Sequence, residues 1–184
     1  MSVTADDATA VAASVTASTS PSTSAGPATA YGSQVLRRTL RRLAAGVTVI
    51  TVPGPAGFTA TSFTSVSLDP ALVSFYLGLN SSALAAVRAA ERFAVHVLGS
   101  EHAGIARRFA RSGVDRFAGV PWRADPDGLP ALDGVPAWLT ARVVLRQEIG
   151  DHLLVVGEVE TGGGHARGQA LVHHDGEFAT AVRL

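Results

Sequence analysis

The chain has 184 residues, and its 15 basic and 15 acidic side chains cancel to a formal net charge of zero. This length can bury the core of one domain, and the neutral charge gives no attraction to nucleic acid or to an acidic membrane. The sequence contains no cysteine, which excludes disulfides, thiolate catalysis and cysteine-based metal sites. No apolar run has the length of a membrane span and no secretory signal opens the chain, so we expect a cytoplasmic protein.

Residues 1–32 are rich in alanine, serine and threonine and show no sustained apolar period. This composition predicts a disordered tail, followed by one ordered domain over residues 33–184. Ser33 is a candidate N-cap for a first helix, in which leucines recur at helical spacing from Leu36 to Leu43. Gly46 is expected to end this helix.

Short runs rich in β-branched and aromatic residues predict strands through most of the domain. The expected strands are 47–52, 57–70, 72–79, 92–98, 137–148, 153–159, 169–172 and 177–182. Helices are expected over 81–90 and 100–111, with an irregular segment over 112–136 and a flexible Gly162-Gly163-Gly164 connection. Many strands with few helices indicate a mainly β fold, a closed antiparallel barrel with helical additions. No Gly-x-Gly-x-x-Gly motif opens a βαβ unit, so a Rossmann domain is not expected.

The strand-like segment from Gly57 to Pro70 carries hydroxyls on both faces. A strand buried on both faces is usually a continuous apolar run, and a strand with one wet face alternates cleanly. This segment does neither. One interpretation is an ordinary threonine-rich edge strand. The other is a strand whose small side chains and short hydroxyls let a planar ligand lie against it.

Several further motifs follow this segment in a particular order. They are Leu72-Val73-Ser74-Phe75-Tyr76-Leu77-Gly78-Leu79, Asn80-Ser81-Ser82, Arg92-Phe93-Ala94-Val95-His96-Val97-Leu98, Arg107-Arg108-Phe109-Ala110, Asp115-Arg116-Phe117-Ala118-Gly119-Val120 and Gly150-Asp151-His152. In this order and spacing, the chain resembles the short-chain flavin reductases, the small partners of two-component flavin-dependent monooxygenases. The resemblance runs from about Leu36 to Phe178.

The resemblance implies an antiparallel split β-barrel that binds flavin, normally as a homodimer. It also implies an NAD(P)H:flavin oxidoreductase. Such an enzyme takes hydride from NADH or NADPH, reduces FMN or FAD, and supplies the reduced flavin to a partner monooxygenase or halogenase. Hydride transfer between two stacked rings depends on positioning and electrostatics, so it needs no conventional catalytic triad.

The resemblance also assigns residues to the flavin. Thr59-Ala60-Thr61-Ser62-Phe63 would line the isoalloxazine and ribityl chain, with Thr64 just beyond. Asn80-Ser81-Ser82, which precedes a helix, would suit the flavin phosphate or would simply cap that helix. Arg107 or Arg108 would be the phosphate's charge partner, or both would be surface residues. The remaining predicted cofactor-binding residues are Phe109, whose alternative role is core packing, Gly46 and His174.

Six histidines are present, and His152 is the one singled out for the reaction. By resemblance, His152 would lie near the nicotinamide side of the flavin and orient the nicotinamide or stabilise reduced flavin. Its alternative is a histidine that merely satisfies a turn. We expect His96 in the core or at a sheet edge, and His102 and His165 at the surface. Since no histidine cluster has the spacing of metal ligands, we expect no metal site.

Two alternative functions compete with the reductase. The first is a non-catalytic flavin-binding or flavin-carrier protein on the same barrel, because fold alone does not imply reaction. A weaker second alternative is a related enzyme that uses a deazaflavin or haem. The Gly150-Asp151-His152 turn favours the reductase, since a pure flavin binder needs no nicotinamide side.

Overall fold

The computed structural model describes residues 27–164 and 168–182. The chain divides into two compact units, residues 1–36 and 37–184, which are described separately. Helix α1 (Pro27–Leu40) begins in the first unit, where a proline suits the first helical position because it has no N–H to leave unpaired. None of the described helices is both long and apolar enough to cross a membrane.

The start and end predicted for the first helix are wrong. The helix begins at Pro27, so Ser33 lies inside it and does not cap it. The helix ends at Leu40, and Gly46 instead belongs to strand β1 (Ala45–Gly46). Of the predicted tail, residues 1–26 lie outside the described residues and 27–32 are helical.

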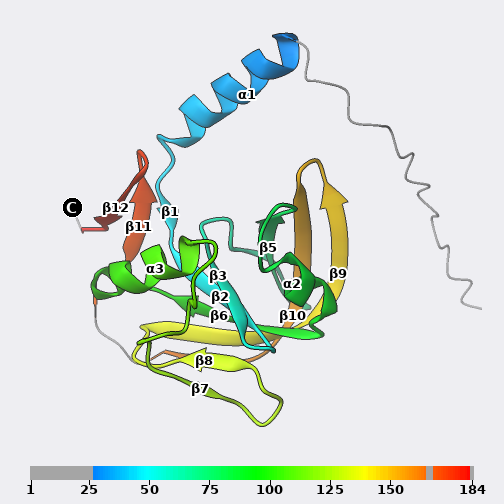
Figure 1. Ribbon diagram of the computed structural model, residues 1–184, viewed down its shortest axis with the longest axis vertical. Helices are drawn as coiled ribbons and strands as arrows, with labels where there is room; N and C mark the ends of the chain where they lie inside the picture. Colours follow the sequence, from blue (N-terminus) through cyan, green and yellow to red (C-terminus); the bar gives the residue numbers. More distant parts are fainter. Residues whose placement is uncertain (1–26, 165–167, 183–184) are drawn as a thin grey trace, which may run out of the picture. The chain divides into compact units, whose positions relative to one another are not determined.

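A seven-stranded antiparallel sheet forms the body of the second unit, in the order β3-β2-β6-β9-β10-β5-β4 (Figure 1). Its strands are β2 (Thr48–Val52), β3 (Ala56–Ala60), β4 (Thr64–Leu68), β5 (Ala71–Gly78), β6 (Arg92–Val97), β9 (Ala137–Ile149) and β10 (His152–Gly164). The mainly β fold is therefore confirmed. Among the described strands, β3 and β4 are the two edges and do not pair with each other, so hydrogen bonding does not close this sheet into a barrel.

Smaller elements surround the sheet. Strand β1 pairs with β11 (Leu171–His174), which pairs with β12 (Glu177–Thr180). A two-stranded hairpin, β7 (Trp122–Ala124) and β8 (Pro130–Leu132), occupies part of the segment predicted to be irregular. The helical elements are α2 (Leu84–Ala89), the short 3-10 turn η1 (Ser100–His102) and α3 (Ala103–Ala110).

The segment from Gly57 to Pro70 is not one strand, as predicted, but two. It forms β3 and β4, which lie at opposite edges of the sheet, with a break at Thr61-Ser62-Phe63. The Ser62 hydroxyl explains the break, because it accepts a hydrogen bond from Tyr76 N at 3.0 Å and donates to Tyr76 O at 3.2 Å. The Ser62 side chain thus takes the place of a neighbouring strand's backbone at Tyr76 of β5. The main chain at Ser62 is therefore not needed for strand pairing and can cross from β3 at one sheet edge to β4 at the other.

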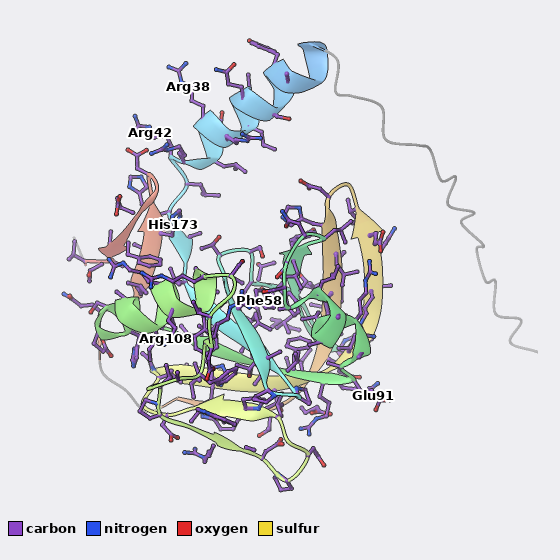
Figure 2. All side chains as sticks on the ribbon, in the orientation of Figure 1. Arg38, Arg42, Phe58, Glu91, Arg108 and His173 are labelled. Carbon is purple, nitrogen blue, oxygen red and sulfur yellow. The ribbon has the colours of Figure 1, made fainter. Side chains whose placement is uncertain are left out.

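Two apolar clusters form the core. In the first, Phe75 lies between Phe58 and Phe93, with ring centroids 5.7 Å and 5.1 Å away. The second lies under α3, where Phe109 and Phe117 meet edge to face at 5.0 Å. Trp122 packs against Phe117. Figure 2 shows Phe58 in the densely packed interior.

Two other predictions are corrected by the structure. Gly162-Gly163-Gly164 is not a flexible connection but the end of β10, paired with Ala137 to Leu139 of β9. A Cβ on Gly163 would lie 3.2 Å from the Trp138 indole nitrogen, so the glycine lets the indole approach the strand backbone. His102 is buried, not at the surface, because its Nδ1 accepts a hydrogen bond from Gly99 N at 3.1 Å. His165 lies outside the described residues.

Candidate flavin site

A cavity of about 450 Å³ lies where the chain crosses from β3 towards β4. Its walls come from β3, the crossing segment, β5, the turn after β5, the C-terminal part of α3 and the start of β10. The residues that line it are Phe58, Thr59, Ala60, Thr61, Ser62, Tyr76, Leu77, Gly78, Asn80, Ser81, Phe109, Ala110, Ser112, Arg116 and His152. This first cavity is therefore walled largely by small and polar side chains.

Several predicted hydroxyls in this cavity are held by the protein itself. Thr59 Oγ1 donates to Ala106 O at 2.7 Å and so ties β3 to α3. Ser81 Oγ accepts from Ala83 N at 3.2 Å within the turn before α2. With Ser62 fixed on β5, these contacts make the hydroxyl-bearing wall a rigid surface.

Close packing at Gly57 positions α3 beside β3. A Cβ on Gly57 would lie 2.9 Å from both Ile50 O and Phe109 Cε1. A side chain at this position would push the Phe109 ring away from the strand. The absence of a side chain thus lets Phe109 border the cavity and also fill the core, while its contact with flavin stays a prediction.

Arg116 is the arginine that lines this cavity. Its guanidinium donates to Arg111 O from Nε at 2.7 Å, to Gly57 O from Nη1 at 2.7 Å, and to Ser82 Oγ from Nη2 at 3.0 Å. Partial burial lowers the pKa of Arg116 from its ordinary value, since desolvation disfavours the charged form. A fixed, partly desolvated guanidinium is well suited to a phosphate group.

His152, at the start of β10, also lines the first cavity. Its Nδ1 lies 2.7 Å from Asp151 Oδ1, and the hydrogen bond to His152 lowers the pKa of the Asp151 carboxyl. With the proton on Nδ1, the other nitrogen, Nε2, is directed towards Gly78, where an added Cβ would lie 4.0 Å from it. The Asp151 carboxylate therefore fixes which imidazole nitrogen is turned to the cavity wall.

The cavity brings together many of the residues predicted from the sequence. Those that line it are Thr59, Ala60, Thr61, Ser62, Asn80, Ser81, Phe109 and His152. Ser82 does not line it but contacts Arg116. Phe63 packs against the first core cluster, and Thr64 begins β4. Gly46 and His174 lie on the three-stranded sheet and do not line this cavity, so their flavin-binding roles stay predictions.

The two arginines that the sequence analysis named as possible phosphate partners do not line the first cavity. Arg107 and Arg108 are exposed on α3, and Figure 2 labels Arg108 there, whereas Arg116 in the following loop reaches the first cavity. Arg116 appeared within the Asp115-Arg116-Phe117 motif, but all 15 basic residues are arginine, so residue type could not select it. Tyr76 and Gly78 also line the first cavity but were not predicted to do so, because their sequence context is that of an ordinary apolar strand.

The fold is that of a known protein family. Residues 40–181 match the flavin reductase like domain. The chain belongs to this family. A curated relative, the NADH:FMN oxidoreductase of Rhodococcus qingshengii, is 48% identical over 127 residues, which are 67% of this chain and 66% of that protein.

Two solved structures of the family share the fold. The NADH:FAD oxidoreductase of Streptomyces globisporus, in complex with NAD and FAD fragments, is 36% identical with a TM-score of 0.77, over 82% of this chain and 94% of that one. BorF, the flavin reductase component of a bacterial two-component tryptophan halogenase, is 34% identical with a TM-score of 0.74. The match covers 80% of this chain and 97% of BorF. The mainly β architecture described above is therefore that of flavin reductases.

Proposed function

We propose that this flavin reductase family member is an NAD(P)H:flavin oxidoreductase that reduces FMN or FAD and releases the reduced flavin. The observation that carries the proposal is the first cavity, which gathers the hydroxyl-rich wall, Phe109, Arg116 and His152 from separate parts of the chain. The nicotinamide gives up hydride from its C4 carbon, and the flavin accepts it at N5 with a proton from solvent. The protein's part is to bind, orient and shield the two rings.

The residues present fit a flavin substrate. The cavity volume of about 450 Å³ lies in the range of small-molecule sites, which is roughly 300–1,000 Å³. Ala60 and Gly78 leave room for a flat ring beside β3 and β5, and Arg116 offers a cation to the phosphate. The role proposed for His152, which Asp151 holds through a 2.7 Å contact, is to orient the nicotinamide and not to donate a proton.

The proposal includes a split β-barrel completed by a second copy of the chain. Cross-strand partners in a sheet share a face, so Tyr76 of β5 lies on the same outer face as Leu145 and Ile149 of β9, with β10 between the two strands. Tyr76 is 41% exposed, Leu145 45% and Ile149 48%, which is unusual for three large apolar side chains on one face. Because Tyr76 also lines the first cavity, a second copy on this outer face would border the flavin site.

The reduced flavin would pass to a separate monooxygenase or halogenase, as the likeness to the halogenase reductase component suggests. FMN and FAD both remain candidate substrates, because one relative is named for FMN and a similar structure contains FAD fragments. NADH is the favoured reductant, because both of these related proteins are named as NADH-dependent oxidoreductases. A cytoplasmic location is part of the proposal, since NADH is regenerated there.

The decisive experiment mixes the purified chain with NADH and FMN, then FAD, in air, and follows absorbance at the NADH band. Rapid flavin-dependent oxidation supports the reductase, and the ratio of the two rates identifies the preferred flavin. Flavin binding without NADH oxidation would overturn the proposal in favour of the carrier alternative. NADPH in place of NADH tests the reductant in the same assay.

A further inference from the structure

A second cavity, of about 220 Å³, shares no lining residue with the first. It lies between β6, β9 and β10 of the large sheet and the β7–β8 hairpin, which Figure 1 shows beside β6 and β9. The lining residues are Arg92, Ala94, His96, Arg123, Asp125, Leu129, Ala131, Leu132, Trp138, Thr140 and Thr161. The flavin site does not use this second cavity, although Arg92, Ala94 and His96 of one sequence motif line it.

Two rows of cross-strand partners form its floor. Ala94, Thr140 and Thr161 make one row, and His96 and Trp138 make the next. The indole of Trp138 lies close to the bare backbone of Gly163, since a Cβ there would be 3.2 Å from the indole nitrogen. The floor is thus small side chains beside an aromatic ring, a surface that suits another ring.

The β7–β8 hairpin, which covers the second cavity, is held to the large sheet by hydrogen bonds. Leu132 N on β8 donates to His96 Nε2 at 3.0 Å, and Thr51 Oγ1 on β2 donates to Pro130 O at 2.6 Å. His96 Nδ1 in turn lies 3.1 Å from Val49 O, so both imidazole nitrogens are engaged within the protein. These bonds hold the hairpin off the sheet at a fixed spacing.

Thr140 supplies an unsatisfied polar group in this floor. The residue is 8% exposed, and its Oγ1 has no hydrogen-bond partner among the residues that the structure describes. A buried hydroxyl without a partner is costly and rare in proteins. Rotation about χ1 exchanges Oγ1 with Cγ2, so a ligand in the cavity that Thr140 lines could bond this hydroxyl.

The charges at the rim argue against an ionic ligand. Arg92 forms ion pairs with Glu160 at 2.7 Å and with Asp127 at 2.5 Å, and Asp125 lies 3.5 Å from it. Arg123 is paired with Asp133. Since each guanidinium already has carboxylate partners, an incoming anion would have to displace them.

We propose that the second cavity binds a small, neutral aromatic compound that carries a hydroxyl, with Thr140 as its hydrogen-bond partner and Trp138 beside its ring. The volume is smaller than that of drug-sized sites and larger than the roughly 150 Å³ cavity that admits benzene, which matches one ring or two fused rings. The proposal is independent of the flavin reaction.

The test uses the full chain saturated with FMN, so that the first cavity is filled, and titrates it with phenol or with toluene by ligand-observed NMR. Toluene has the shape of phenol without the hydroxyl. We expect phenol to bind saturably at about 1 mM or below, given typical ligand efficiencies. Thr140→Val should weaken phenol binding by about 3- to 10-fold, the equivalent of one neutral hydrogen bond, and change toluene binding by less than about 2-fold.

A filled cavity provides the control. Ala131→Leu should abolish binding of both probes, and Thr161→Leu, at an exposed strand position, should do the same if Ala131→Leu does not fold. Thermal unfolding of each variant establishes that it is folded. Three results would each overturn the proposal. They are phenol binding that does not saturate, probe binding to the filled variants that equals wild type, and a Thr140→Val variant that loses affinity for phenol and toluene equally.

Discussion

Arg116 Nη1 donates a hydrogen bond to the carbonyl oxygen of Gly57 at 2.7 Å, across 59 residues of sequence. The same guanidinium donates to Ser82 Oγ at 3.0 Å. One side chain therefore links the loop after α3, the start of β3 and the turn before α2, three segments that border the first cavity. This arrangement makes Arg116 the residue whose loss should most directly separate phosphate binding from the rest of the site.

Arg116→Ala should raise the KM for FMN by about 10- to 100-fold, because a charge-assisted hydrogen bond contributes roughly 1.5–3 kcal/mol. The KM for riboflavin, which has no phosphate, should change by less than about 3-fold on the same reasoning. Steady-state assays with both flavins measure the two constants. The exposed Arg38→Ala is the matched control and should behave as wild type. Equal losses for FMN and riboflavin would instead assign Arg116 to holding the loop.

His152→Ala should lower kcat/KM for NADH by about tenfold, which corresponds to ~1.4 kcal/mol of lost positioning. Asp151→Asn should have a smaller effect in the same direction, since the carboxylate acts through the imidazole at 2.7 Å. Stopped-flow reduction of bound flavin separates NADH binding from hydride transfer. Unchanged kcat and NADH KM in His152→Ala would reduce this histidine to a structural turn residue.

Stability should fall as the pH falls from about 6.5 towards 4. Burial lowers the pKa of His96 from 6.5 to about 4. Over this range the unfolded chain gains a proton at His96 that the folded chain does not, so the free energy of unfolding decreases, by about 3 kcal/mol in total. Below about pH 4 this contribution is fully lost, and above pH 6.5 it is fully present.

Urea unfolding at several pH values measures this effect. His96→Asn removes the titrating group, so its free energy of unfolding should be lower than wild type at pH 7.5 but should depend less on pH between 6.5 and 4.5. A wild-type profile that is flat over this range, or one that His96→Asn leaves unchanged, would contradict the assignment.

Gly157→Ala should destabilise the fold by about 1–3 kcal/mol, the usual range for overpacking a core. A Cβ at this position would lie 2.6 Å from Phe93 Cζ, and Phe93 packs edge to face on Phe75 at 5.1 Å. Gly104→Ala is the matched control. It meets nothing within 4 Å in helix α3 and should stabilise by about 0.5–1 kcal/mol. Chemical denaturation ranks the two variants, and a stable Gly157→Ala would mean that the Phe93 ring moves aside cheaply.

Leu145→Glu should convert the proposed homodimer to a monomer, because it places a charge on the outer face that carries Tyr76 and Ile149. Size-exclusion chromatography with light scattering measures the mass. Val114→Glu is matched in exposure, 46% against 45%, and lies in a loop, so it should leave the mass unchanged. A Leu145→Glu chain that stays dimeric would move the interface to another surface.

The sequence by itself predicted the mainly β fold and the approximate extents of strands such as β2, β5, β6 and β9, because β-branched runs and turn residues are local signals. It also pointed to His152, Phe109 and the Thr59 to Ser62 wall through an ordered set of motifs. Local patterns failed where a distant contact decides the structure. Ser62 breaks the predicted strand because its hydroxyl bonds the backbone of Tyr76, 14 residues away.

Only the tertiary structure selected Arg116 among many arginines, since selection depends on which guanidinium reaches Gly57 O and Ser82 Oγ. The same holds for the second cavity, whose floor joins Ala94, Thr140 and Thr161 from three strands. Hydrophobic period and turn chemistry act between neighbours in sequence, whereas a binding site is made by strand register. Register sets which side chains share a face, and it is fixed only when the whole sheet is paired.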